Sequence, residues 1–347
     1  MRACGHRCGA LMRDPVLHGE YQSVADMQEQ PDSVLGAICF SSTPLMVDQA
    51  LCLHVPMQRL DQPDEAVCEV WRCSGQVAAG QYGDIRYRQG DGVLFGVIAL
   101  PEHRFDAGRP LLQQAAESAY RQVFELLNRL EYHYLFRFWN YIADINAESF
   151  GMERYQQFNI GRQDAFLAHG RDVLGNAPAA CALGMREGPL AIAFIAGTAP
   201  PLNIENPRQI SACRYPQQYG PRSPTFSRAS LVRIGKGTVL FISGTASIVG
   251  HATLHHDDAV MQTREAMANI KAVLDEANRQ SPDSFDLAGL AYRVYIRHPA
   301  DLAPVRAELV RIVGEQCTAV YLQADICRTD LLLEIEAVHA TKSFGME

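Results

Sequence analysis

The sequence predicts an α+β fold in which two related modules follow a β-rich N-terminal segment. Apolar runs of strand length alternate with longer runs that have the periodicity of a helix. A similar order of strands and helices occurs twice, with an offset of about 140 to 150 residues. A chain of 347 residues that is 48% hydrophobic can bury a core of this size. We therefore expect an N-terminal segment at residues 1–75, a first module at 76–200 and a second module at 201–347.

The N-terminal segment and the second module can be divided into expected elements. Residues 33–75 alternate short apolar runs with Pro, Asp and Gly, which is typical of β-rich segments. In the second module we expect strands at 238–243, 292–298, 317–325 and 331–338, and helices at 257–278 and 305–314. Asp257 and Asp258 are candidate N-caps of the first helix. This order predicts a mixed sheet with two helices on one face.

The first module repeats these elements but differs in its last strand. The runs that correspond to elements of the second module are 93–100, 118–130, 138–145 and 177–197. The last strand of the first module has alanine and phenylalanine where the second module has Glu334 and Glu336. A buried strand needs no carboxylate, and burying one costs free energy unless a partner satisfies it. We therefore predict a functional role for Glu334.

Two segments have the composition of loops that present cations and phenols to a ligand. Residues 153–166 and 213–228 are rich in Arg and Tyr, with interspersed Gly and Pro. A guanidinium group can bind a carboxylate through two parallel hydrogen bonds. The arginines of these segments and of a later strand end therefore predict, as a set, an anionic ligand. The candidates are Arg162, Arg214, Arg222, Arg228 and Arg297.

Charge, hydropathy and cysteine content argue against several classes of protein. A net charge of -8 argues against a nucleic-acid binder. No apolar run reaches the roughly 18 residues of a membrane span, and residues 1–17 do not resemble an export signal. Ten cysteines without CxxC pairs fit a reducing cytoplasm better than a disulfide scaffold. We expect a cytoplasmic protein that is a monomer rather than an obligate oligomer.

Two groups of residues have the side chains of metal ligands, but we expect no metal site. The groups are Cys4, His6 and Cys8 near the N-terminus, and His251, His255, His256, Asp257 and Asp258. The first group lacks the second ligand pair of a zinc site. In the second group, the two acids serve better as the cap of the following helix. No Gly-rich phosphate loop, Ser-His-Asp arrangement or HExxH motif is present either.

Four stretches of the second module resemble the family of reactive-intermediate imine deaminases. They read GPRSPTF at 220–226, LFISGTA at 240–246, QTREAMANIKAVL at 262–274 and EIEAV at 334–338. The resemblance implies that both modules have the imine-deaminase fold, which is also called chorismate-mutase-like. The deaminases place an arginine for the substrate carboxylate near the start of the penultimate strand, where this chain has Thr318 and Ala319. We therefore expect the fold without the deaminase chemistry.

Nearly the whole chain resembles a second family, the chorismatases, which act on chorismate. The stretches that carry the resemblance are RYQQFNIGRQDAF at 154–166, YGPRSPTFSRAS at 219–230, FISGTASIVGHAT at 241–253 and DICRTDLLLEIEA at 325–337. The resemblance implies cleavage of the enolpyruvyl ether of chorismate and release of pyruvate, a reaction that requires no metal or redox cofactor. Gly244 and Cys327 resemble the branch that forms 3-hydroxybenzoate, in some members together with 4-hydroxybenzoate. The alternative is the hydrolytic branch, which tends to have alanine at both positions and releases a dihydroxycyclohexadiene carboxylate.

The resemblance and the chemistry of the residues together assign expected roles. Glu334, in an apolar strand, would stay protonated near neutral pH and deliver a proton to the enol methylene carbon. Cys327 would control the fate of the ring after pyruvate begins to leave. The residues expected to bind chorismate are Arg162, Tyr215, Arg222, Arg228, Gly244 and Arg297, of which Arg162, Arg222 and Arg297 are expected to line one pocket. An imine deaminase and a non-catalytic protein that binds a small ligand remain alternatives from other classes.

Overall fold

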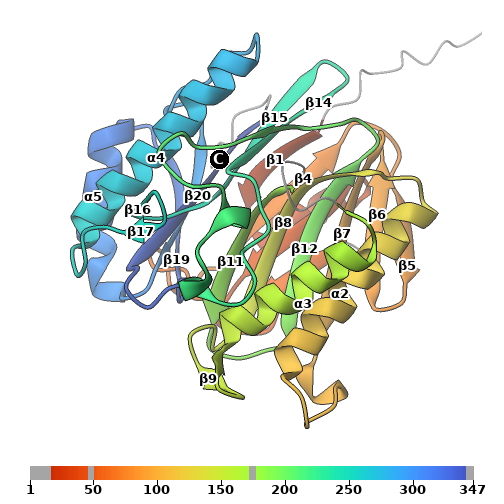
Figure 1. The fold of residues 1–347 in the computed structure, drawn as a ribbon. Helices are drawn as coiled ribbons and strands as arrows, with labels where there is room; N and C mark the ends of the chain where they lie inside the picture. Colours follow the sequence, from red (N-terminus) through yellow and green to blue (C-terminus); the bar gives the residue numbers. More distant parts are fainter. Residues whose placement is uncertain (1–16, 46–50, 172–176, 341–347) are drawn as a thin grey trace, which may run out of the picture.

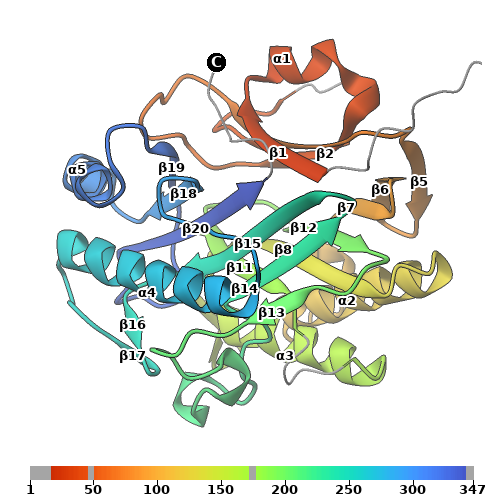
Figure 2. The ribbon, with the colours of Figure 1, turned by 90° about the horizontal axis from the view of Figure 1, so that it is seen from above.

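A computed structural model describes residues 17–45, 51–171 and 177–340. Three β-sheets pack around a shared core, and the helices cover the outer faces of the sheets (Figures 1 and 2). The predicted α+β fold is confirmed. The predicted boundaries after residues 75 and 200 fall between the strands of successive sheets. The division into three domains remains a prediction.

The N-terminal sheet has four strands in the order β1-β4-β2-β3. Its elements are β1 (Leu17–Gln22), α1 (Val24–Glu29), β2 (Val34–Phe40), β3 (Cys52–Val55) and β4 (Val67–Cys73). Ser23 begins helix α1 as an N-cap, because its hydroxyl accepts a hydrogen bond from the backbone N–H of Asp26 at 3.2 Å. The expected β-rich segment is therefore a sheet.

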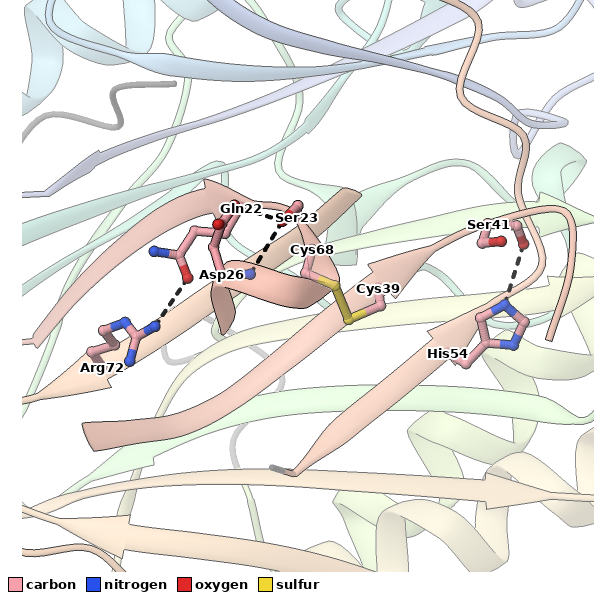
Figure 3. The surroundings of a disulfide bond; sticks show 8 residues. All are labelled: Gln22, Ser23, Asp26, Cys39, Ser41, His54, Cys68 and Arg72. Atoms are coloured by element: carbon pink, nitrogen blue, oxygen red, sulfur yellow. Dashed lines mark hydrogen bonds between the residues drawn. A yellow bond between two sulfur atoms is a disulfide. The ribbon is translucent and has the colours of Figure 1, made fainter. Parts of the chain in front are cut away.

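One disulfide bond lies within this sheet and joins Cys39 of β2 to Cys68 of β4 (Figure 3). The two cysteines are directly opposite each other in the antiparallel strand pair, so their Cβ atoms lie close together. This bond corrects the expectation that the cysteines are free thiols. The sequence gives no signal for it, because the partners are 29 residues apart and belong to no recognised motif.

The first module is a six-stranded sheet with the order β11-β8-β12-β7-β6-β5. Its strands are β5 (Ala78–Tyr82), β6 (Ile85–Gly90), β7 (Val93–Leu100), β8 (Tyr134–Ala143), β11 (Ala179–Met185) and β12 (Leu190–Gly197). Its helices are α2 (Leu111–Arg129) and α3 (Arg154–Ala168), and a small hairpin is formed by β9 (Glu148–Ser149) and β10 (Met152–Glu153). Both helices lie on one face of the sheet (Figure 1).

The second module is a six-stranded sheet with the order β13-β14-β15-β20-β18-β19. Its strands are β13 (Leu202–Ile204), β14 (Ala229–Ile234), β15 (Gly237–Thr245), β18 (Ala291–Ile296), β19 (Thr318–Gln323) and β20 (Leu333–Ala340). Its helices are α4 (Ala259–Gln280) and α5 (Leu302–Val313), and a small hairpin is formed by β16 (Ile248–Val249) and β17 (Ala252–Thr253). Asp258 caps α4 as expected, because its carboxylate accepts from the backbone N–H of Met261 at 2.9 Å.

The two modules have the same topology, which confirms the predicted internal repeat. Read from β11 and from β19, the two sheets have corresponding strands in the same order. The pairs β8/β11 and β18/β19 are parallel, and the other neighbouring strands in both sheets are antiparallel. Each module has one helix before and one helix after its strand β8 or β18.

The N-terminal sheet contains a reduced version of the same pattern, which the sequence does not predict. Strands β2 and β3 are parallel, β2 and β4 are antiparallel, and β4 and β1 are antiparallel, as are the corresponding strands of both modules. Short helix α1 lies between β1 and β2, at the position of α2 and α4. The molecule thus consists of two complete copies and one reduced copy of a single unit.

Helix α3 corrects the expectation that residues 153–166 form a loop. The helix is the counterpart of α5, and it buries the polar side chains of Gln157, Asn159 and Arg162 together with Phe158. These buried polar residues obscure the apolar periodicity by which a helix is recognised in a sequence. Gly161 allows α3 to pack closely on α2, because a Cβ atom there would collide with the backbone carbonyl of Gln113.

The shared core lies between the inner faces of the three sheets. Trp71 of β4 packs on Phe241 of β15 with ring centroids 5.2 Å apart, and on Trp139 of β8 at 6.3 Å. Each of these rings comes from a different sheet, so the core joins the three units. Within the described residues, no helix has both the length and the apolar character needed to cross a membrane.

Candidate active site

A cavity of about 160 Å³ lies at the junction between the two modules. Its walls come from α3 and β11 of the first module and from β15, β20 and residues 205–228 of the second module. Two serines of the second module hold the junction together. The Ser230 hydroxyl accepts from the backbone N–H of Ala179, and the Ser243 hydroxyl accepts from that of Ala180, each at 2.9 Å. The site is therefore composed by both modules.

Glu334 lies on β20 and faces the cavity with only 5% of its surface exposed. No hydrogen bond or ion pair to its carboxyl group is present among the residues that the structure describes. Burial and, to a lesser extent, the nearby Glu336 carboxylate raise the pKa of Glu334 to about 8 against the opposing effects of Arg137 and Arg228. The carboxyl group is therefore mostly protonated at neutral pH, as predicted from the sequence.

Gly244 lies at a register shift in β15, where the pairing with β20 is interrupted. A Cβ atom at this position would collide with the Glu334 carboxyl group and would lie 3.1 Å from the Cβ atom of Cys181. The absence of a side chain at Gly244 is therefore what leaves room for the Glu334 carboxyl group in its present position.

Arg162 reaches the cavity from α3 and is 2% exposed. Its guanidinium group donates to the Asn159 side-chain carbonyl at 2.7 Å and lies 4.9 Å from the ring centre of Phe158. The Nε atom of Arg162 is buried and has no hydrogen-bond partner in the structure. A buried cation with a neutral anchor and an unpaired donor favours an anionic ligand.

Arg228 and Arg328 line the cavity from the second module and also have neutral anchors. Arg228 donates to the backbone carbonyl of Ile210 at 2.9 Å and to the Tyr215 hydroxyl at 3.0 Å. Arg328 donates to the backbone carbonyl of His251 at 2.9 Å and lies 3.9 Å from the ring centre of Tyr219. Both guanidinium groups are thus positioned without being neutralised.

Arg162 and Arg228 are buried and Arg328 is half-buried, and all three differ from the other buried arginines of the described chain. Each of the others pairs with a carboxylate, and they are Arg59, Arg72, Arg137 and Arg293. No carboxylate among the described residues lies within 4.0 Å of the guanidinium groups of Arg162, Arg228 or Arg328. The cavity therefore combines three guanidinium groups that have no carboxylate within 4.0 Å with the protonated Glu334 carboxyl group. Glu153 adds a second carboxyl group to the cavity wall, and burial raises its pKa.

The expectation that Arg222 and Arg297 line the same pocket as Arg162 is wrong. The Arg222 side chain is 45% exposed and lies 3.6 Å from Asp164, outside the cavity wall. Arg297 pairs with Asp325 at 2.5 Å and donates to the backbone carbonyls of Arg328 and Leu331, each at 3.0 Å. Its hydrogen-bonding capacity is used to fold the connection between β19 and β20, so it positions the residues of that connection.

Cys327 belongs to this connection and lines the cavity next to Arg328. Burial and, to a lesser extent, Glu334 raise the pKa of its thiol to about 12 against the opposing effect of Arg328. The thiol is therefore neutral at physiological pH, which argues against a thiolate nucleophile. It can donate a weak hydrogen bond to a neighbouring group.

The structure brings most of the predicted site residues together and adds one. Those that line the cavity are Glu334, Cys327, Arg162, Tyr215, Arg228 and Gly244. Arg328 was missed, although it directly follows Cys327 in the stretch DICRTD that carries the family resemblance. The proximity of these two residues in sequence was the available signal for Arg328.

The histidines and aspartates at 251–258 are dispersed among different partners. His255 lies 3.4 Å from Glu265, His256 lies 3.8 Å from Asp330, and Asp258 caps α4. No cluster with the composition of a metal site occurs among the described residues. Cys4, His6 and Cys8 lie outside the described residues.

Comparison with known proteins identifies the family. The family model for the N-terminal domain of FkbO/Hyg5-like chorismatases matches residues 69–196. A Streptomyces rapamycinicus protein named chorismatase is 36% identical over 298 residues, covering 83% of this chain and 87% of the relative. A Streptomyces hygroscopicus protein named 3-hydroxybenzoate synthase is 37% identical over 284 residues, covering 79% of this chain and 82% of the relative.

A solved structure agrees with these sequence relatives. The crystal structure of a chorismatase matches this fold with a TM-score of 0.85 at 32% sequence identity, covering 94% of this chain and 99% of that chain. At this coverage the match extends over nearly the whole chain. By the identity and coverage of its relatives, this chain belongs to the chorismatase family.

Proposed function

We propose that this enzyme converts chorismate into 3-hydroxybenzoate and pyruvate. The observation that carries the proposal is the combination of three uncompensated arginines with one protonated carboxyl group in a single cavity. The 3-hydroxybenzoate synthase of Streptomyces hygroscopicus, at 37% identity, supports the choice of product. The site residues and their roles below are part of this proposal.

The arginines would bind the two carboxylates of chorismate, one on the ring and one on the enolpyruvyl group. Arg162 approaches from the first module, and Arg228 and Arg328 approach from the second. Because their anchors are neutral, each can form a charge-assisted bidentate contact with a ligand carboxylate. The dianion would supply the negative charge that the cavity lacks, and Tyr215 would orient Arg228.

Glu334 would act as the general acid. Transfer of its proton to the methylene carbon of the enolpyruvyl group gives an oxocarbenium ion, from which the ring C–O bond breaks as pyruvate leaves. The raised pKa of Glu334 keeps this proton available at neutral pH. The resulting carboxylate can later accept a proton from the ring, so the group is restored at the end of the cycle.

Gly244 and Cys327 would favour the aromatic product. The neighbouring ring hydroxyl attacks the carbon that loses pyruvate and forms an arene-oxide-like intermediate. Opening of this intermediate with loss of a ring proton gives 3-hydroxybenzoate. One chorismate gives one hydroxybenzoate and one pyruvate, so atoms and electrons balance without an oxidant or a water molecule. Attack by water instead would give the dihydroxycyclohexadiene carboxylate, which is the alternative product.

Incubation of the purified protein with chorismate tests this proposal. Chromatography with mass detection should show 3-hydroxybenzoate and pyruvate in equal amounts, with or without a smaller amount of 4-hydroxybenzoate. In deuterium oxide, the methyl group of pyruvate should gain a single deuterium, because the methylene carbon is protonated by an exchangeable acid. A diene diol as the main product would establish the hydrolytic alternative, and the absence of pyruvate would overturn both.

A further inference from the structure

Four buried charged residues meet behind the cavity, where the three sheets come together. They are Glu69 of β4, Arg137 of β8, Arg293 of β18 and Glu336 of β20. Each has at most 5% of its side chain exposed. The N-terminal sheet, the first module and the second module therefore all contribute to this central charge cluster.

The central charge cluster is internally neutral. Arg137 pairs with Glu336, while Arg293 pairs with Glu69 and, at 3.0 Å, with Glu336. The Tyr295 hydroxyl donates to Glu336 at 2.7 Å. Two carboxylates thus compensate two guanidinium groups in a region that excludes water. Removing one member would leave a buried charge of the opposite sign without a partner.

The charges of this cluster affect the protonation of the neighbouring Glu334. It lies two residues before Glu336 on β20, so both side chains point to the same face of the strand. Arg137 is the cation that most strongly favours ionisation of Glu334, ahead of Arg228. Arg137 already pairs with Glu336, so it does not form an ion pair with Glu334.

We propose that Glu336 and Glu69 keep Glu334 protonated by pairing with Arg137 and Arg293, so that neither of these two cations is free to ionise the general acid. This inference rests on the proposed function, because it explains how Glu334 keeps the proton that the reaction uses. The charged and titratable groups that face Glu334 or the cavity that it lines are Glu336, Arg137, Arg162, Arg228, Arg328, Glu153, Cys181, Cys327 and Tyr155.

The first module shows that the acids of this cluster are not needed by the fold itself. At the positions that correspond to Glu334 and Glu336, opposite Tyr141 and Trp139, β12 has Ala191 and Ala193, which corrects the alanine and phenylalanine expected from the sequence. A sheet of the same topology therefore forms with small apolar residues at both places. The acids of the second module have a use beyond holding the strands together.

The test compares the pH dependence of kcat/KM in the wild type and in Glu336→Gln. Glutamine is nearly isosteric and can still accept from Arg137, but it leaves this arginine uncompensated. Glu334 should then ionise more readily, and the alkaline limb of kcat/KM should move to lower pH by about one unit or more. Activity lost at neutral pH should return as the pH is lowered.

Two further variants keep the test decisive if Glu336→Gln does not fold. Glu69→Gln changes a residue of the N-terminal sheet that does not line the active-site cavity, and it should shift the limb in the same direction by a smaller amount. The double variant Glu336→Gln with Arg137→Gln restores neutrality and should return the limb toward that of the wild type. Exposed Glu315→Gln, which removes a charge at the surface, should leave the limb unchanged.

This inference would be overturned if folded Glu336→Gln and Glu69→Gln kept the alkaline limb of kcat/KM at its wild-type pH and showed only a lower rate. Infrared difference spectroscopy of the Glu334 carboxyl group, assigned by its loss in Glu334→Gln, measures the same protonation without turnover. If the wild type does not cleave chorismate but the Glu334 band still shifts in these variants, the proposed function fails while the electrostatic inference stands.

Discussion

The two modules share one topology but differ in the residues that they direct toward their junction. Corresponding positions opposite Tyr141 of β8 and Tyr295 of β18 hold Ala191 in the first module and Glu334 in the second. The helices, the strand order and the parallel pair are otherwise the same. Under the proposed function, the chemistry therefore depends on a few side chains placed at one sheet face, and not on the fold itself.

The connection before the last strand shows a second difference. In the first module, residues 186–189 join β11 directly to β12. In the second module, the longer connection 324–332 leads from β19 to β20, carries Cys327 and Arg328 to the cavity, and is held by Arg297. The first module contributes Arg162 and the wall of β11 instead. Under the proposed function, the binding groups thus come from both modules, whereas the acid comes from one.

The largest expected effect comes from removing the acid of the second module, because the first module has no acid at the corresponding position. Glu334→Gln keeps the shape of the side chain but removes the transferable proton. Pyruvate release should fall about 10²- to 10⁴-fold, which is the usual contribution of a general acid. A coupled lactate dehydrogenase assay measures it.

Because glutamine can be buried without ionising, Glu334→Gln should keep the melting temperature and the affinity for chorismate close to those of the wild type. Circular dichroism and calorimetry provide these controls. Near wild-type pyruvate release from the folded variant would exclude Glu334 as the acid. Glu336, on the same strand face, would then become the next candidate.

A smaller effect is expected from removing the cation that the first module supplies. Arg162→Met should weaken binding by about 2 to 5 kcal/mol, which corresponds to roughly 30-fold or more in Kd. Calorimetric titration with chorismate on the catalytically silent Glu334→Gln background measures this change. Arg222→Met is the matched control, because Arg222 is exposed and pairs with Asp164 outside the cavity.

The same variant separates a binding role from a structural one. Arg162 is a buried cation without a carboxylate partner, so its replacement by an apolar side chain of similar length should leave the fold as stable or more stable. A large fall in melting temperature together with unchanged affinity would show that Arg162 supports the helix and does not bind the substrate. Equal loss of affinity in Arg222→Met would contradict the site as described.

Much of the fold could be predicted, because strands and helices with apolar periodicity leave a clear pattern. Helix α4 with its cap at Asp258 and the repeat of the modules follow from such patterns. Helix α3 was missed because Arg162, the residue that makes it useful to the site, interrupts its apolar face. The buried arginine that conceals this helix in the sequence is therefore the residue that we propose binds the substrate.

The site could be predicted where a residue type conflicts with its surroundings. Glu334 was found because a carboxyl group in an apolar strand requires an explanation. Arginines carry no such signal, since a guanidinium group can bind a ligand, pair with an acid or fold a loop. Arg297 was expected to bind the ligand and Arg328 was not considered, because only the three-dimensional structure shows that Arg297 already has the Asp325 carboxylate as its partner.

The smallest expected change in rate concerns Cys327, for which the identity of the product should change instead. Cys327 lies in the connection before the last strand, which is longer in the second module than in the first. Its thiol is neutral and lies on the cavity wall, where it can contact the ring after pyruvate begins to leave. If it directs the intermediate toward the aromatic product, Cys327→Ala should change the ratio of 3-hydroxybenzoate to 4-hydroxybenzoate or diene diol, while pyruvate release stays within about tenfold. Cys317→Ala is the matched control, because Cys317 packs on the helix side of the second module away from the cavity. Chromatography of the products decides the question. A Cys327→Ala variant that loses stability but forms 3-hydroxybenzoate in the original proportion would show that Cys327 only fills space. The choice of product would then rest on the room that Gly244 leaves beside Glu334.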